Sequence, residues 1–485
     1  MTINSTSDHN RPARPRAKWV VAVALLALST VGCFEDGALN IDPNRSTTAE
    51  PALLFSGAEV KFSLLRVAEL TWPTALMSQM WASGAAWGLE QAQYDQTRIR
   101  SAWGSIYVDV LKNLKLATAE ANSRSPKPNN TIAQLMIYQA FVFSQTTYLW
   151  GDIPFSEAAS GEVDLPKFDT QEAVLNGTIK MLDDAIALID ANSIKIGAPN
   201  DLYYGGDMDK WRKFANSLKF RILMTMVDAD PTKSAAIGAM SGRPMIGSRA
   251  DEMKFAYFDS PGRQNPRFSF TQIFRGGVQQ DWYASDVMFN EMVPFNDPRL
   301  SIYFQPGPSA ASNEFLSLAG VNPRTPKSSL VSLNLLKANL PEVSFSYSEQ
   351  LLLEAEATAR GFWQGGIAAA DLRFRAGVRE SMSAYGVPTA AAETYIAALP
   401  VLDAANFRRE LNRQQWLDLF MRPLEGWVQW RRSGPAGQEY PAMTVPQGAQ
   451  SANLVRRLTY RSEEINSNPN TPKGLLVDSR LWFDK

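Results

Sequence analysis

The side chains that most often carry catalysis or bind metals are nearly absent from this sequence. Its 485 residues include one histidine, His9, and one cysteine, Cys33. Ser-His-Asp and Cys-His catalysis need an imidazole to move the proton, and zinc sites need Cys or His ligands. Beyond Cys33 the chain therefore excludes these chemistries and any disulfide. It leaves carboxylate chemistry, carboxylate-bound calcium or binding without chemistry. Of these we expect binding, with no catalytic residue, no metal site and no cofactor.

One pair of carboxylates, Glu354 and Glu356, invites comparison with the acid and base of a glycoside hydrolase. A hydrolase places two carboxyl groups about 5–10 Å apart in one cleft. Residues two apart on a helix point to different faces. We therefore expect one of the two to be buried against an Arg and the other to be solvated, which does not indicate an enzyme.

Tryptophans beside glycine and amide side chains give the clearest indication of a binding site. Sugar rings present an apolar face and a rim of hydroxyls, so their sites combine flat exposed aromatics with polar side chains. Two segments fit, 79–95 and 265–283, both predicted to be loops. The alternative is that these tryptophans pack beneath the loops, as most tryptophans do. The side chains that we expect to contact ligand are Trp81, Trp87, Tyr94, Arg275, Asp281 and Trp282.

The first 36 residues have the layout of an export signal. Four basic residues between Arg11 and Lys18 precede an apolar run, 19–28, and small residues follow up to Cys33. A membrane span needs roughly twenty apolar residues, so this run is too short to be one. Charge, apolar run and small residues in this order are typical of a secretory signal.

Cys33 directly follows a Gly, where bacterial lipoprotein signals place the cysteine that is acylated. Thr30 departs from that pattern, which usually has Leu there. We predict a signal peptide over 1–32, a lipidated N-terminus at Cys33 and a polar tether over 33–46, so that the protein is held to a membrane by its lipid anchor. The alternative is an ordinary secretory signal in which Cys33 is incidental.

The charge balance argues against a nucleic-acid partner. The chain has 48 Lys and Arg against 49 Asp and Glu, and the first 33 residues hold four of the former and one of the latter. The remainder is weakly acidic, with 44 against 48. It therefore lacks the positive surface that nucleic-acid binding needs.

Beyond the tether, apolar residues recur at helical spacing, which predicts a helix over about 51–69 and then pairs of helices. Small residues, Ala355, Ala357 and Ala359, are expected where two helices cross. The pairs resemble degenerate tetratricopeptide-type repeats. We predict a mainly α single domain over 47–485, with a large loop-rich excursion at 230–344 that is rich in Pro, Gly, Ser and Asn. The remaining helices are expected at 102–121, from 131 to 148, 170–191, 208–228, 345–361 and 365–385, and a last pair is expected near 404–432.

Several short motifs follow one another in a fixed order along nearly the whole chain after Cys33. They are Leu39-Asn-Ile-Asp-Pro-Asn44, Tyr148-Leu-Trp-Gly-Asp-Ile-Pro-Phe-Ser-Glu157, Asp201-Leu-Tyr-Tyr-Gly-Gly-Asp207, Trp211-Arg-Lys-Phe-Ala-Asn-Ser-Leu218, Asn296-Asp-Pro-Arg-Leu300, Tyr347-Ser-Glu-Gln-Leu-Leu-Leu-Glu-Ala-Glu-Ala357, Glu425-Gly-Trp-Val-Gln-Trp-Arg-Arg432, Arg457-Leu-Thr-Tyr-Arg-Ser-Glu463 and Arg480-Leu-Trp-Phe-Asp-Lys485. No motif is distinctive alone, but in this order the chain resembles the SusD/RagB family of outer-membrane lipoproteins, and in particular the SusD-like nutrient-binding proteins.

The resemblance implies a SusD-like fold and a cell-surface lipoprotein that binds nutrient, mostly glycans, without catalysis. It also implies a partner, a SusC-like TonB-dependent outer-membrane transporter on which the protein sits as a lid. The acidic pair Glu35 and Asp36 is similar to the signal that sends such lipoproteins to the cell surface. Three alternatives stay open: a peptide ligand, a surface glycoside hydrolase and a purely structural repeat lipoprotein. Nothing in the sequence separates a glycan from a peptide.

Overall fold

Most of the chain after residue 49 is described by the computed structural model, which covers residues 50–83, 100–159, 163–274, 276–277, 281–311, 327–446, 449 and 451–485. The predicted signal, Cys33 and the tether lie outside the described residues, and so do Trp87, Tyr94 and Arg275. Ala49–Lys485 forms one compact unit.

The first described helix, α2 (Pro51–Val67), runs through the core of this unit. It begins at a proline, whose fixed φ suits the first helical position. Phe55 and Phe62 lie on its buried face and are fully covered. A short turn leads from its end to α3 (Thr71–Met77), which is almost entirely buried.

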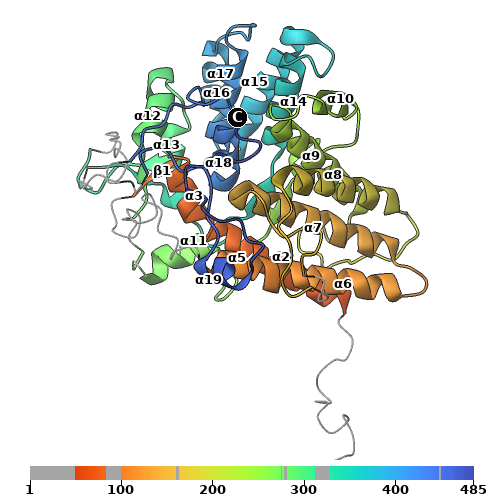
Figure 1. The fold of residues 1–485 in the computed structure, drawn as a ribbon. Helices are drawn as coiled ribbons and strands as arrows, with labels where there is room; N and C mark the ends of the chain where they lie inside the picture. Colours follow the sequence, from red (N-terminus) through yellow and green to blue (C-terminus); the bar gives the residue numbers. More distant parts are fainter. Residues whose placement is uncertain are drawn as a thin grey trace, which may run out of the picture. The chain divides into compact units, whose positions relative to one another are not determined.

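Helices α6 to α9 lie one beside the next in chain order, and α7 contacts both α6 and α8 (Figure 1). Nearly all residues of α7 are buried, including polar ones such as Gln134 and Gln139, whose side chains donate hydrogen bonds inside the protein. The side chains of Thr170 and Asp207 cap the first turns of α8 and α9 by accepting backbone N–H bonds. This part comprises α5 (Arg100–Ser105), the π-helical η3 (Ile106–Leu111), α6 (Lys112–Ser123), α7 (Asn129–Trp150), α8 (Gln171–Leu188) and α9 (Met208–Met226).

A second group of helices continues from α9, which contacts α14. Helices α14 and α15 cross closely at Gly377. A Cβ placed on this residue would lie only 2.8 Å from Cγ of Leu352. Ala355 and Ala357 are fully buried, as expected for small residues at a crossing. The group comprises α14 (Tyr347–Ala359), α15 (Gly366–Ala384), α16 (Thr389–Ala398), α17 (Phe407–Asp418) and α18 (Pro423–Arg431).

Between these groups, residues 230–344 form short elements, as predicted for the loop-rich excursion. The described helical segments are α10 (Lys233–Gly238), η4 (Arg249–Asp251), α11 (Pro266–Ser269), η5 (Phe270–Phe274), α12 (Asp286–Met292), η6 (Val293–Phe295), α13 (Leu300–Tyr303) and η7 (Leu333–Leu335). The strands are β2 (Met253–Phe255), β3 (Tyr283–Ala284), β4 (Phe304–Gln305), β5 (Leu330–Val331) and β6 (Glu342–Phe345). A last short helix, α19 (Ser462–Ser467), lies near the C-terminus.

The strands form two small antiparallel sheets. One has the order β1-β3-β5-β4, where β1 is Trp81–Ala82 and pairs Trp81 with Ala284. The other pairs β2 with β6, with an irregular register between Met253 and Lys254. The strands were not predicted, because each is too short to show an alternating pattern in the sequence.

The predicted fold class, mainly α with helix pairs as its scaffold, is confirmed. The helix pairs lie where they were predicted to within a few residues, including the last pair, which is α17 and α18, whereas α16 was missed. Among the described residues, none of the helices combines the length and the apolar character that a membrane crossing requires.

Candidate ligand-binding site

Trp81 and Trp282, two of the predicted ligand contacts, lie together but inside the core. Both are at most 1% exposed. Trp282 stacks on Trp72 with ring centroids 4.6 Å apart and an angle of 1° between the rings, and Trp81 lies 5.8 Å from Trp282. The expectation that these two rings stand exposed was wrong, because the pairing of β1 with β3 turns them toward each other and toward Phe420.

Asp281 is also buried, at 2% exposure. The other three predicted contacts, Trp87, Tyr94 and Arg275, lie outside the described residues. The two predicted segments are thus brought together at the β1–β3 pair, and ligand binding by them stays a prediction.

A cleft beside α3 and α11 offers space for a ligand, with a volume of about 440 Å³. Volumes of this order are typical of small-molecule sites. Its mouth includes the exposed residues Asn334, Lys337, Pro341, Ala384 and Gly386. Its floor consists of buried polar and charged side chains: Arg66, Thr71, Glu252, Arg267, Glu342, Ser346, Ser348, Asp418, Arg422 and Glu425.

Arg66, from α2, ties three elements together at this floor. Its Nε donates to Oε1 of Glu342 on β6 at 2.9 Å, and its Nη2 donates to Oε1 of Glu425 on α18 at 2.8 Å. Nη1 donates to Gln145 of α7 at 3.0 Å. Burial disfavours its charge, but the carboxylates of Glu425 and Glu342 outweigh burial and raise the pKa of Arg66. The guanidinium is therefore a fixed cation.

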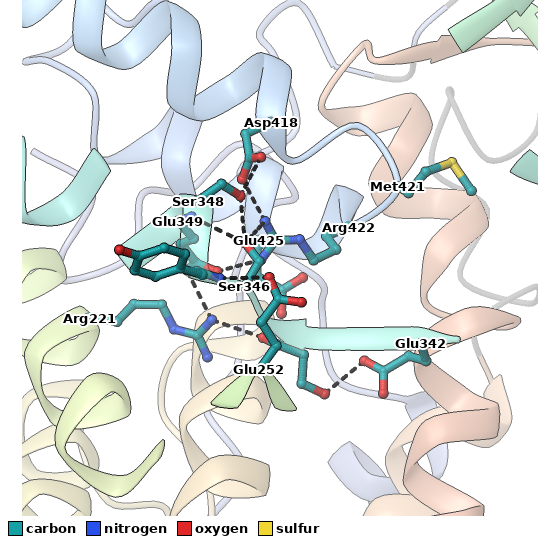
Figure 2. Close-up of polar contacts among 12 residues, drawn as sticks. Arg221, Glu252, Glu342, Ser346, Ser348, Glu349, Asp418, Met421, Arg422 and Glu425 are labelled. Atoms are coloured by element: carbon teal, nitrogen blue, oxygen red, sulfur yellow. Dashed lines mark hydrogen bonds and ion pairs between the residues drawn. The ribbon is translucent and has the colours of Figure 1, made fainter. Parts of the chain in front are cut away.

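Arg422 is the centre of a second cluster of hydrogen bonds and ion pairs at the floor of the cleft (Figure 2). Its Nη2 donates to Asp418 at 2.7 Å and to the hydroxyl of Ser346 at 2.8 Å, and its Nη1 donates to Glu349 at 2.5 Å. Glu349 also accepts a bond from Arg221 at 3.1 Å. Burial raises the pKa of Asp418, against the opposing effect of Arg422. These pairs hold the start of α14 against the start of α18.

Two cations of the cleft have no acid partner. Six positively charged side chains line it, against the four carboxylates of Glu252, Glu342, Asp418 and Glu425. All four carboxylates are paired with Arg66, Arg422 or Lys254, and Arg249 pairs with Glu380 outside the lining. Among the described residues, no carboxylate lies within ion-pair distance of the remaining two, Arg267 and Lys337.

Arg267 is the unusual one, because it is 6% exposed and makes no ion pair among the described residues, although the charge of Glu342 acts on it from beyond ion-pair distance. Its Nε donates to the carbonyl of Val67 at 3.1 Å, and its Nη2 donates to the hydroxyl of Thr71 at 2.8 Å. Burial lowers the pKa of Arg267 to about 10. The guanidinium thus remains charged at neutral pH, and its Nη1 has no acceptor within the described part of the chain.

Glu354 and Glu356 lie in different surroundings, as predicted. Glu356 is buried and accepts bonds from Arg432 at 2.7 Å and 3.1 Å. Burial would raise its pKa, but Arg432 and Arg360 lower it to about 2. Glu354 is partly exposed and accepts from Gln350 at 2.9 Å, and burial raises its pKa. In the part of the chain that the structure describes, no cluster of side chains is suited to hold a metal ion.

Sequence reasoning missed the cleft because its lining comes from distant segments. The available signal was a pair of charged residues, Arg422 and Glu425, inside an otherwise apolar stretch. Charged groups are rarely buried unless they are paired. Such residues therefore point to a buried network, although they do not identify their partners.

Comparison with known proteins agrees with this fold. A family model described as SusD-like, starch-binding associating with outer membrane, matches residues 43–461. Since the match spans most of the 485 residues, the chain belongs to the SusD-like family, whose members associate with the outer membrane. A search of curated proteins found no match.

Solved structures with the same fold span nearly the whole chain. A chitin-binding protein matches with 22% identity over 90% of this chain and 100% of its own, with a TM-score of 0.77. A chitin-binding SusD homolog from Flavobacterium johnsoniae matches with 21% identity over 90% and 97%, with a TM-score of 0.73. A SusD homolog from Parabacteroides distasonis matches with 21% identity over 90% and 97%, with a TM-score of 0.72. At these identities the likeness establishes the fold.

Proposed function

We propose that the protein is a cell-surface lipoprotein that captures glycans for uptake and acts as the lid of a SusC-like TonB-dependent transporter. The observation that carries the proposal is the family match over residues 43–461, with its description of starch binding and outer-membrane association. Two structural neighbours described as chitin-binding point to the same class of ligand.

The cleft supports a binding role. It combines about 440 Å³ of space with hydroxyls and charged groups that are already held in place by ion pairs. A preorganised polar floor binds a hydroxyl-rich ligand without having to order its own side chains first.

The lipid anchor is proposed at Cys33, from the signal layout before it. Replacement Cys33→Ala should move the protein from the membrane fraction to the soluble fraction, whereas Ser29→Ala should leave it bound. Labelling with palmitate should be lost only in the first variant. A Cys33→Ala protein that stays in the membrane would contradict the anchor.

The ligand class is tested by measuring binding of the purified protein to starch and chitin oligosaccharides and to a peptide library. We expect saturable binding of at least one glycan. Binding of peptides alone would replace the glycan proposal with the peptide alternative. Hydrolysis of a bound oligosaccharide that is abolished by Glu354→Gln or Glu356→Gln would favour the hydrolase.

The partner is tested by affinity purification in mild detergent. We expect a large outer-membrane barrel protein to copurify with the wild-type protein in stoichiometric amount. Purification of the protein alone under these conditions would count against the lid role and would leave glycan binding in place.

A further inference from the structure

We propose that the same cleft, which is lined by Arg267 and by Glu342 of β6, binds an anionic group carried by the saccharide ligand. The group is a carboxylate or a sulfate ester. The inference rests on the proposed function, because it takes the ligand to be a saccharide. It adds the charge of the ligand, and it places the selective contact at Arg267 and Lys337.

The charges of the cleft carry the first step. Six cations and four carboxylates line it, and two of these cations, Arg422 and Arg249, also pair with Glu349 and Glu380 from outside the lining. Every carboxylate of the lining is engaged by Arg66, Arg422 or Lys254. Arg267 and Lys337 are therefore the two lining cations that make no ion pair among the described residues, and a ligand anion can supply a partner there.

The burial of Arg267 carries the second step. Removing an uncompensated charge from water is costly, so buried cations are almost always paired. Arg267 is 6% exposed, yet it is bound only to the carbonyl of Val67 and the hydroxyl of Thr71. A guanidinium in a cavity with one nitrogen unengaged is suited to an oxyanion, because planar N–H donors match carboxylate and sulfate oxygens.

The position of Lys337 carries the third step. Asn265 joins the segment of Arg267 to the segment of Lys337: its N–H donates to the carbonyl of Ala338 at 2.8 Å, and its side chain donates to that of Leu340 at 2.9 Å. The Asn265 side chain also accepts from N–H of Arg267 at 3.0 Å. One residue thus fixes the buried cation beside the loop that carries Lys337 at the mouth.

A purely structural role for Arg267 would be to satisfy carbonyls at the end of α2. Its Nε has that role, through the carbonyl of Val67, and its Nη2 donates to the hydroxyl of Thr71 at the start of α3. That role does not need Nη1, and it does not need a charge in a cavity. A structural role alone predicts that ligand charge has no effect on binding.

The test compares charged and neutral forms of the same ligand backbone. Oligogalacturonate, its fully methyl-esterified form, a sulfated galactan oligosaccharide and neutral starch and chitin oligosaccharides are titrated into the purified protein by calorimetry. The variants are Arg267→Gln, Arg267→Lys and Lys337→Gln. Lys195→Gln is the charge-matched control, since Lys195 is exposed and lies outside the lining.

We expect an acidic oligosaccharide to bind and its methyl-esterified or neutral counterpart to bind at least about tenfold more weakly, as for loss of a charged hydrogen bond. Arg267→Gln should remove this preference, and Lys337→Gln, which cannot disturb the buried floor, should reduce it several-fold. Arg267→Lys should keep part of it, and Lys195→Gln should change nothing. Thermal melting of each variant shows whether it is folded.

Binding of neutral glycans with no acidic oligosaccharide bound would overturn this inference and leave the proposed function standing. Acidic binding that is unchanged in both Lys337→Gln and a folded Arg267 variant would also overturn it. Failure of every saccharide in the panel to bind would overturn the proposed function together with this inference. Preference for the sulfated or for the carboxylated oligosaccharide identifies which anion the cleft selects.

Discussion

The aromatic cluster and the cleft meet at the same short segments, around α3 and α11, and they bury opposite kinds of side chain. Thr71 lines the cleft, whereas its neighbour Trp72 stacks on Trp282. Arg267 lines the cleft, whereas Phe270 lies 5.7 Å from Trp72. Apolar rings interdigitate until their space is filled. Ion pairs hold a fixed geometry around a cavity of about 440 Å³.

This comparison reverses the expectation from the sequence that tryptophans indicate the ligand. In the described residues, Trp81 and Trp282 lie in the closely packed core and not at a free surface. The open space is lined in part by arginines and carboxylates, and of these only Arg267 makes no ion pair within the described part of the chain. Changes in the aromatic cluster should therefore affect mainly stability, whereas changes at Arg267 and Lys337 in the cleft should affect ligand binding.

The largest effect on stability is expected at the cleft floor. Arg66→Met leaves the carboxylates of Glu342 and Glu425 buried without their cation. Removing one partner of a buried pair costs about 3–5 kcal/mol, and two acids lose theirs here. Urea unfolding measures the loss, and Arg212→Met, which breaks an exposed pair with Asp209, should cost less than about 1 kcal/mol. Equal effects would mean that the floor is not a buried network.

A loss nearly as large is expected in the aromatic cluster. Trp282→Ala removes a fully buried ring from its stack with Trp72. A cavity of this kind costs about 3–5 kcal/mol. The change should lower the unfolding midpoint in urea far more than Trp482→Ala, where the ring is only partly buried. A Trp282→Ala protein of normal stability and weakened ligand binding would restore Trp282 as a contact.

A pH-dependent contribution is expected from Glu356. Its pKa in the folded protein is about 2, below its ordinary value of 4.5, because Arg432 and Arg360 outweigh burial. A lowered pKa stabilises the fold above pH 4.5, and this stabilisation is lost as pH falls from 4.5 to 2. The contribution is about 3 kcal/mol.

The measurement is the free energy of unfolding as a function of pH. Glu356→Gln should be less stable than wild type at neutral pH, and the difference should shrink as pH falls toward 2. Glu393→Gln, at an exposed pair with Arg379, is the control and should change the profile little. A difference that is constant with pH would show that Glu356 is not the titrating group.

The smallest effect is expected for Trp87, which lies outside the described residues. If its ring stacks on the ligand, Trp87→Ala removes about 0.5–1.5 kcal/mol of binding free energy beyond area burial. Glycan affinity should then fall several-fold while the urea midpoint stays unchanged. Unchanged affinity would leave the cleft as the sole candidate site.

The helical scaffold could be predicted from the sequence because each helix carries its own apolar period and its own end signals. Thr170 and Asp207, for example, are good N-caps and do cap α8 and α9. The cleft could not be predicted, since Arg66, Arg267 and Arg422 meet only through the tertiary fold. Burial of Trp81 and Trp282 depends on a pairing of two-residue strands, which leaves no periodic signal.

The close crossing at Gly377 has a consequence for how such a pocket diversifies. Leu352 packs on Gly377, and the same helix, α14, carries Ser348 at the floor of the cleft. Any side chain at position 377 would displace α14 and with it that floor. Ligand preference can therefore change during evolution through a scaffold residue that does not contact the ligand. Relatives with identical lining residues need not bind the same ligand.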